Sequence, residues 1–436
     1  MRRVLIITYY WPPGAGAGVF RWLKFTRYLR HFGWEPVIYT PLNPESPVMD
    51  PSLEADIPGG VEVIRQPIWE PYDYYKRLTG RKPGEKIQTG FLSEHKKAGW
   101  GEKLATWIRG NFFIPDARKY WIKPSVGYLT HWIRVHQVDA IVSTGPPHSM
   151  HLIALGIKKN TGLPWLADFR DPWTQIDFYD QLMLTPWANK KHLRLEKNVL
   201  QTADQVVTVS ASWASGLRER CNRDIQVITN GYDPDDFRSL PAFEHGDFSI
   251  THLGTMNADR NPEVLWPVLA ELVKTDVFFS TQLKIQLIGK TDIRARESIR
   301  DHGLDAYTSI ISHLPHREAL SLAARSAVLL LPLNNTPNVS GITPGKLYEY
   351  MALQRPVLCI GPANGDAARI IRDSVMGLVA GFEDASACKR ALISWKEAFL
   401  NNQLHVRLQQ IEPYSRKNLT GEMAQLLNLM TQKGKK

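Results

Sequence analysis

The sequence predicts an α/β protein with two doubly wound domains, each built on a parallel sheet covered by helices. Apolar runs of strand length alternate with helical patterns in both halves of the chain, as in sheets joined by helical crossovers. A polar, turn-rich stretch interrupted by Pro234 and Pro241 separates the halves and is typical of a linker. At 436 residues, the chain is long enough for each domain to bury its own core.

The first half is predicted to contain strands at short apolar runs, namely 4–8, 36–39, 140–143, 165–168, 205–209 and 226–229. Helical patterns fall between them, for example at 20–31, 148–159 and 191–200. Together these elements predict an N-terminal domain that covers residues 1–235.

The second half repeats the alternation, with strands predicted at 248–253, 283–288, 307–311, 327–331 and 356–360. Apolar residues recur at helical spacing from 414 to 430. After the first domain we therefore expect a linker at 236–247, a C-terminal domain at 248–413 and a final helix at 414–436.

The composition argues against a membrane-spanning or disulfide-rich protein. The start Met1-Arg-Arg resembles that of a signal peptide, but the apolar run after it is too short and lacks a cleavage site, so it is interpreted as a strand. No run reaches the ~18 apolar residues of a membrane span. Cys221, Cys359 and Cys388 are widely spaced and odd in number, which indicates neither disulfides nor a metal cluster. We expect a cytoplasmic protein.

The net charge of +10 is concentrated in a predicted insertion at about 76–123. Twelve Lys or Arg residues stand there against four acids, with tryptophan and phenylalanine between them. Basic residues among aromatic ones indicate an anionic membrane surface or nucleic acid. The alternative is a solvated, partly helical insertion whose aromatic side chains face the core. We expect peripheral contact with the inner face of a membrane and no nucleic-acid partner.

A glycine-rich turn follows the first predicted strand. Gly14, Gly16 and Gly18 precede a helix, where backbone N–H groups can point at a phosphate. The spacing departs from the dinucleotide fingerprint because Arg21 stands where its last glycine would fall, and no acid follows the second strand. A nicotinamide enzyme is therefore disfavoured, and a tight turn without a ligand stays an alternative.

The stretch at 340–360 reads as a small-residue turn, a short helix with one acid, and a buried strand. Gly341, Ile342 and Thr343 can expose free N–H groups to an anion, and Pro344 suits the first helical turn. Glu349 lies one to two turns into that helix, where a carboxylate can accept hydrogen bonds from a ribose diol. The alternative for Glu349 is a surface acid stabilised by the helix dipole.

Taken in order, these and other segments resemble family-4 glycosyltransferases of the GT-B architecture, over essentially the whole chain. The matching segments are Tyr9-Tyr-Trp-Pro-Pro-Gly, Ile228-Thr-Asn-Gly-Tyr-Asp, His252-Leu-Gly-Thr, Leu287-Ile-Gly-Lys, 344–360 and Tyr414-Ser-Arg-Lys-Asn-Leu-Thr. The resemblance implies two Rossmann-like domains that face a cleft, with the nucleotide-sugar donor on the C-terminal domain and the acceptor on the N-terminal one. It also implies retention at the anomeric carbon and a last helix that crosses back to the first domain.

Two departures from the family pattern concern the donor site. Gly341 stands where the family has a second Glu, eight residues before Glu349, so the carboxylate that usually touches the transferred sugar is absent. Thr255 and Arg260 stand where the family usually has an Arg and then a Lys for the diphosphate. Arg260 still offers a bidentate fork, and Lys290 or Lys346 could supply the second charge. A solvated loop arginine is the alternative for Arg260.

The end of the strand at 165–168 carries Asp168, Arg170 and Asp171, at the edge of the sheet where α/β proteins bind ligands. Arg170 stands where the family often has a histidine, and an arginine cannot act as a base, so Asp168 or Asp171 is the candidate to orient or deprotonate an acceptor hydroxyl. The alternative is a structural Asp–Arg pair. His148 is a further candidate at a helix start, where a purely structural role is the alternative.

Other motifs point to a loop contact and to no metal. Leu314 lies in the sequence His313-Leu-Pro-His316, whose backbone could line a base pocket, although an ordinary loop fits equally well. Asp233-Pro-Asp235 has the spacing of metal-binding acids but lies at the linker, where aspartate favours turns. We expect no metal and no cofactor.

The resulting hypothesis is a retaining transfer of a sugar from a nucleotide diphosphate, a UDP-sugar being favoured over a GDP-sugar, to a hydroxyl of a saccharide. A lipid-linked saccharide and a role in cell-surface polysaccharide biosynthesis are expected. The alternatives are a nucleotide-sugar epimerase of the same architecture and a non-catalytic sugar-nucleotide binding subunit.

Overall fold

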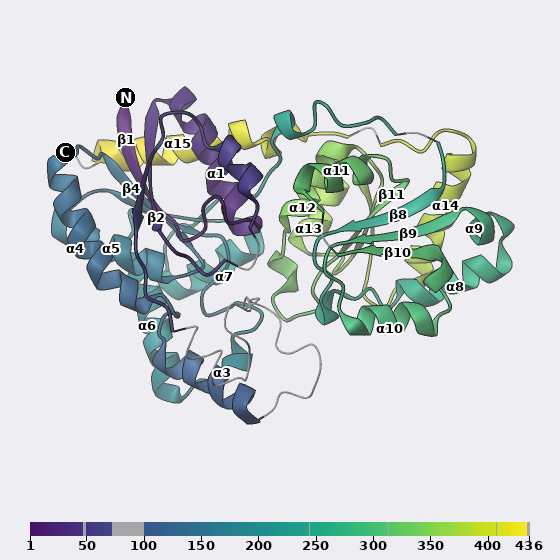
Figure 1. Cartoon of the computed structure of the whole chain (residues 1–436), viewed down its shortest axis with the longest axis horizontal. Helices are drawn as coiled ribbons and strands as arrows, with labels where there is room; N and C mark the ends of the chain where they lie inside the picture. The colour runs from purple at the N-terminus through teal and green to yellow at the C-terminus, as the bar shows by residue number, and fades with distance from the viewer. Residues whose placement is uncertain (47–48, 72–99, 244, 313, 407, 434–436) are drawn as a thin grey trace. The chain divides into compact units, whose positions relative to one another are not determined.

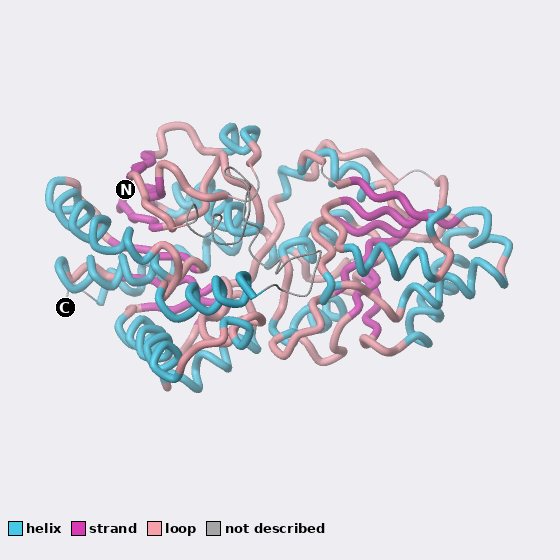
Figure 2. Tube along the Cα trace, turned by 60° about the horizontal axis from the view of Figure 1, so that its bottom comes forward, coloured by secondary structure: helices cyan, strands magenta, loops and turns pink. Residues whose placement is uncertain are grey.

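The computed structural model describes all residues except 47–48, 72–99, 244, 313, 407 and 434–436 (Figure 1). The chain divides into two compact units, Met1–Thr229 with Arg416–Lys436, and Asn230–Ser415. In each unit a parallel sheet lies between two layers of helices (Figure 2). The predicted α/β class, with one doubly wound sheet in each half, is confirmed.

The first unit contains a sheet with the strand order β3-β2-β1-β4-β5-β6-β7. Its strands are β1 (Arg2–Ile7), β2 (Trp34–Pro41), β3 (Glu62–Gln66), β4 (Ala140–Gly145), β5 (Trp165–Phe169), β6 (Gln205–Thr208) and β7 (Gln226–Val227). The chain order reverses between β1 and β4. In doubly wound sheets, ligands bind outside the carboxyl ends of the strands at such a switch point.

Helices cover both faces of this sheet: α1 (Ala17–Leu29), α4 (Lys119–Val135), α5 (Ser149–Thr161), α6 (Pro186–Thr202), α7 (Ala211–Cys221) and α15 (Arg416–Lys433). A further helix, α3 (Trp100–Phe112), contacts α6. Alternate residues of β1 pack into different cores, as the period of a strand requires. Leu5 packs with α4, α5 and α6, whereas Val4 packs with α1 and α15. The final helix thus belongs to the first unit.

The second unit repeats the plan with the order β10-β9-β8-β11-β12-β13. Its strands are β8 (Phe248–Leu253), β9 (Leu283–Ile288), β10 (Thr308–Ile311), β11 (Val328–Pro332), β12 (Val357–Ile360) and β13 (Gly377–Ala380). Its helices are α8 (Leu265–Thr275), α9 (Val277–Gln282), α10 (Ile293–Asp301), α11 (His316–Ala324), α12 (Gly345–Leu353), α13 (Asp366–Asp373) and α14 (Ala385–Leu400). The switch point lies between β8 and β11.

Some predicted elements have different bounds in the structure. The run at 226–229 forms only the two-residue strand β7, and α6 begins at Pro186, before the predicted 191. The first half of the predicted basic insertion, 76–99, lies outside the described residues. Its later part forms α3 and the start of α4, where Trp121 is buried in the core. Within the described residues, no helix is long and apolar enough to cross a bilayer.

Candidate functional site

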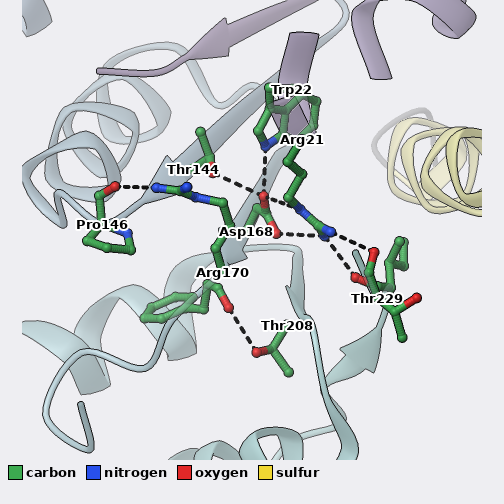
Figure 3. A network of polar contacts seen from close by, with 10 residues as sticks. Arg21, Trp22, Thr144, Pro146, Asp168, Arg170, Thr208 and Thr229 are labelled. Carbon is green, nitrogen blue, oxygen red and sulfur yellow. Dashed lines mark hydrogen bonds and ion pairs between the residues drawn. The ribbon is translucent and has the colours of Figure 1, made fainter. Parts of the chain in front are cut away.

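Asp168 lies at the carboxyl end of β5 and is fully buried. Its carboxylate accepts hydrogen bonds from Arg21 Nε and Nη2, both 3.1 Å, from Trp22 Nε1 at 2.7 Å and from Thr144 Oγ1 at 3.0 Å (Figure 3). Thr144 stands opposite Asp168 on the neighbouring strand β4. These donors occupy both carboxylate oxygens, which is the pattern of a structural ion pair rather than of a base.

Arg21 is the partner that the sequence did not reveal. Its guanidinium, also fully buried, donates from Nη1 to Thr229 O at 2.8 Å and from Nη2 to Ile228 O at 2.9 Å. One arginine on α1 therefore joins β5 to the segment after β7 (Figure 3). The residue that breaks the dinucleotide fingerprint is the cation of this buried pair. The Asp–Arg alternative holds for Asp168, with Arg21 in place of Arg170.

Arg170 instead lies against the glycine-rich turn. Its Nη2 donates to Pro146 O at 2.5 Å, and its guanidinium lies 6.0 Å from the centre of the Tyr10 ring. A Cβ on Gly18 would come within 2.8 Å of Arg170 Nη1, so a side chain there would displace the guanidinium. Gly16 precedes α1 with φ +110°, a conformation that favours glycine. The structure thus brings Gly18 and Arg170 together at one edge of the sheet.

Asp171 is the carboxyl group with a perturbed pKa at this edge. Burial raises the pKa of Asp171 above its usual range, and the charges of Asp177 and Asp168 raise it further, while Arg170 lowers it. A raised pKa favours the protonated form of a carboxyl group and makes its carboxylate a better base. Asp171 therefore stays a candidate for proton transfer, whereas Asp168 does not.

His148 precedes α5 and is stacked on Trp173, with ring centres 4.7 Å apart. Burial lowers its pKa well below the usual range, and the charges of His151 and Arg170 lower it further. His151 donates or accepts at Nδ1 with Ser143 Oγ at 2.8 Å, and burial lowers its pKa to about 3. Within the described part of the chain, His148 Nδ1 and His151 Nε2 have no hydrogen-bond partner. Both rings are neutral at pH 7.

Two glycine turns meet at the carboxyl ends of the neighbouring strands β8 and β9, beside the switch point of the second sheet. Gly254 follows β8 with φ +89°, and Gly289 follows β9 with φ +134°. A Cβ on Gly289 would lie 2.5 Å from Gly254 O, and a Cβ on Gly254 would lie 3.2 Å from Lys346 Nζ. Both the backbone angles and the close approach therefore favour glycine at these turns.

Lys346, in the first turn of α12, reaches this place. Its Nζ lies 3.3 Å from His252 Nε2, while His252 Nδ1 lies 3.0 Å from Leu330 O. Because a carbonyl oxygen accepts only, Nδ1 carries the proton and Nε2 accepts from Lys346. Burial lowers the pKa of Lys346 well below its usual range, Arg260 lowers it further, and Glu349 raises it. Burial likewise lowers the pKa of His252.

Arg260 and Lys346 thus place two interacting cations at one edge of the sheet. Arg260 Nη1 donates to Thr255 O at 2.8 Å, which fixes the arginine over the loop after β8. Two nearby cations are unfavourable until an anion joins them, so the arrangement suits a diphosphate. Lys290 follows Gly289 in the neighbouring turn, where its carbonyl oxygen accepts from Met256 N at 2.9 Å.

Glu349, on α12, accepts from His316 Nε2 at 3.0 Å. Before it, Gly341 ends a short 3-10 turn, and Thr343 is buried with no partner for Oγ1 among the described residues. Ile342, between these two residues, packs against the core. Pro344 is the N-cap, and α12 begins one residue after the proline that we expected inside its first turn.

The remaining predicted residues lie in turns. Leu314 precedes α11 and packs against the core of the second unit. Asp233 accepts from Asp235 N at 3.2 Å, so its carboxylate stabilises the turn. Across the described ranges, no group of three or more His, Cys, Asp or Glu side chains could hold a metal ion.

Comparison with known proteins follows this geometry. The family model for Glycosyltransferase Family 4 matches residues 91–236. This segment is therefore similar to a family-4 glycosyltransferase domain. A search of the curated proteins gives no significant match.

Solved structures share this fold over nearly the whole length of the chain. Sucrose-phosphate synthase from Thermosynechococcus elongatus is 14% identical, with TM-score 0.59 and coverage of 100% of this chain and 98% of that one. Anabaena HepE in complex with UDP and glucose is 13% identical, with TM-score 0.62 and coverage of 98% and 100%. A putative UDP-N-acetylglucosamine 2-epimerase from Listeria monocytogenes is 10% identical, with TM-score 0.53 and coverage of 99% and 97%. The fold is the two-domain, Rossmann-like GT-B fold.

Sequence reasoning missed several partners in this glycosyltransferase. Arg21 and Asp168 are far apart in sequence, and no local pattern joins them. His252 and His316 lie beside Lys346 and Glu349, but a lone histidine gives no signal of its partner. His151 Nε2, the nitrogen without a hydrogen-bond partner among the described residues, lies close to the turn at Gly145. A Cβ added at Gly145 would lie 2.6 Å from this atom.

Proposed function

We propose that this glycosyltransferase moves a sugar from a nucleotide-diphosphate donor to a hydroxyl of a saccharide acceptor, with retention at the anomeric carbon. The observation that carries the proposal is the pair of cations, Arg260 and Lys346, beside the glycine turns at Gly254 and Gly289. Preorganised charges aimed at a departing diphosphate are an efficient way to lower the barrier of such a transfer.

The remaining donor contacts come from α12 and the turn before it. Glu349 is proposed to bind the ribose diol, and the N–H groups of Gly341, Ile342 and Thr343 to bind phosphate oxygen. Lys290 adds charge from the neighbouring turn, and Leu314 lines the base pocket. In the first unit, Gly16 and Gly18 are proposed to leave room for a ligand at the edge of its own sheet. A UDP-sugar is favoured, and the similarity to HepE, whose structure contains UDP and glucose, supports this choice.

The described side chains favour a front-face displacement. The bond between the anomeric carbon and the diphosphate oxygen breaks, the acceptor oxygen bonds to that carbon on the same face, and the acceptor proton passes to the departing phosphate. Asp168 is bonded to Arg21, and His148 is neutral and buried, so neither is placed as a strong base. Asp171 and Arg170 are proposed to orient the acceptor.

We further propose a lipid-linked saccharide acceptor, a role in cell-surface polysaccharide biosynthesis and peripheral contact with the inner face of an anionic membrane. The concentration of basic and aromatic residues in the first unit supports this proposal. Nothing in the proposed chemistry requires a metal ion or a cofactor.

The test is to incubate the protein with a UDP-sugar alone and then with a panel of lipid-linked saccharides, and to analyse the products by mass spectrometry. We expect glycosylated acceptor and free UDP only when both substrates are present. Isomerised sugar without acceptor would identify an epimerase, the alternative that the Listeria structure favours. Binding without turnover would identify a non-catalytic subunit, consistent with Gly341 in place of the usual acid.

A further inference from the structure

The first unit carries an aromatic and basic surface where α3 ends and α6 begins. Phe112 is 57% exposed, Met183 is 41% exposed and Trp187 is 63% exposed. Lys119 Nζ donates to Phe112 O at 2.6 Å, and Lys191 Nζ lies over the Trp187 ring. With Lys190, which precedes Lys191 on α6, they complete what we call the α3–α6 surface. In Figure 1, α3 and α6 are neighbours at one end of the first unit, and the two helices contact each other.

A hydrogen-bond network fixes the backbone beneath this surface. The buried Asn111 donates to Trp107 O at 2.8 Å and to Met183 O at 3.1 Å, and it accepts from Thr185 N at 2.7 Å. A Cβ on Gly110 would lie 2.7 Å from Leu182 O, so α3 and the loop before α6 are in close contact. The exposed aromatic side chains are therefore held outward by a well-packed backbone.

Charge extends this surface along α6. Exposed cations follow Trp187 at spacings that keep them on one side of the helix, namely Lys190, Lys191, Arg194 and Lys197. The acid of the same helix, Glu196, points inward, where Thr174 donates to it at 2.6 Å. Asp180, before the loop, is an exposed acid nearby. The exposed side of α6 is thus strongly basic.

We propose that the α3–α6 surface docks on an anionic lipid bilayer, with Trp187 and Phe112 in the headgroup region and the α6 cations against lipid phosphates. Exposed tryptophan beside a stripe of long cations matches both parts of a membrane interface, the apolar boundary and the anionic headgroups. Lys191 Nζ lies 4.9 Å from the Trp187 ring, so the two kinds of contact are adjacent. This inference rests on the membrane contact in the proposed function and names the surface that makes it, but it is independent of the donor chemistry.

The test is flotation of the full chain with vesicles of phosphatidylcholine alone or mixed in equal parts with phosphatidylglycerol. We expect binding to the anionic vesicles that weakens as salt rises and little binding to neutral ones. Replacing Lys190 and Lys191 with Gln should lower the partition coefficient about fivefold per charge, or about 25-fold together. Trp187→Ser should lower it by a salt-independent factor.

Matched controls separate this surface from a general charge effect. Lys274→Gln with Arg294→Gln removes two exposed cations from the second unit and should leave vesicle binding unchanged. Val277→Ser, at a 79% exposed apolar residue, is the control for Trp187→Ser. Binding of UDP checks that each variant is folded. If a variant lost UDP binding but kept its vesicle binding, the change would concern the donor site alone. Equal binding of neutral and anionic vesicles, or equal losses for the control pair, would overturn the proposal.

Discussion

At the scale of single residues, burial separates a structural carboxylate from a candidate for proton transfer. Asp168 and Asp171 are close in sequence, but Asp168 is enclosed by donors from Arg21, Trp22 and Thr144. Asp171 is only half-buried, and its pKa is raised. Both were predictable as strand-end acids, but their roles depend on α1, which lies far away in the sequence.

The first prediction concerns the pair of Asp168 and Arg21. Asp168→Asn should leave a buried guanidinium without its counter-charge, at a cost of about 3 to 5 kcal/mol in the free energy of unfolding. Denaturant titration measures this loss. Asp171→Asn is the control, and its free energy of unfolding should stay close to that of the parent protein. A stable Asp168→Asn variant that has lost only transferase activity would contradict the structural role.

The second prediction concerns the charge of Lys346. Because burial and Arg260 lower its pKa, Lys346 loses its proton as pH rises through a value below the usual one of about 10.4. The charged form binds a diphosphate, so above about pH 7, where the phosphate itself is fully ionised, UDP affinity should fall as pH rises through that lowered pKa.

Lys346→Arg provides the control, since arginine keeps its charge throughout this range. Its UDP affinity should show a flatter pH dependence by calorimetry. Uridine, whose uracil N3–H also ionises in alkaline solution, reports the part of the dependence that belongs to the base, and this part should be the same for both proteins. A UDP affinity that rises with pH in the parent protein would exclude Lys346 as the titrating cation.

The third prediction concerns Glu349. Glu349→Gln keeps the shape of the side chain but replaces a charged acceptor, so nucleotide affinity should fall about tenfold to hundredfold. Thermal stability without ligand should change little, because the carboxylate is partly exposed. An unchanged affinity for UDP would rule out the ribose contact.

At the scale of elements, apolar runs predicted the strands well where both neighbours bury them, as in β1, β4 and β11. The edge strand β3 was missed, because only Ile64 of its residues is buried and no apolar run marks it. The start of α6 was placed too late, although Thr185 caps the helix by accepting from Ala188 N and Pro186 follows it. Charged residues in the first turns of α6 concealed its length from a search for apolar spacing.

The fourth prediction tests the packing of α15 on the first unit. Met423 is fully buried against the core that α1 shares with the sheet, so Met423→Ala should cost about 2 to 5 kcal/mol in the free energy of unfolding. Leu429, on the same helix, is 50% exposed, and Leu429→Ala should change stability by less than about 0.5 kcal/mol. Equal losses in denaturant titration would contradict this packing.

At the scale of the whole molecule, the sequence was sufficient to predict the fold class and the resemblance to a family. Each half of the chain alternates strands with helices, and the motifs keep their order, even though sequence identity with known structures is low. The candidate site was only partly predictable. Glu349 and Arg260 stand in recognisable segments, whereas His252 and His316 join them only through the folded sheet. Contacts between distant strands leave no mark in a single sequence.

The most direct test of the central claim is a calorimetric comparison of UDP and uridine on the parent protein and on Arg260→Ala. Arg260 is proposed to contact the diphosphate, so its loss should weaken UDP binding about tenfold to hundredfold, the cost of a charge-assisted contact. Uridine binding should stay unchanged. Equal losses for uridine and UDP, or a parent protein that does not bind UDP, would contradict a diphosphate site in the second unit.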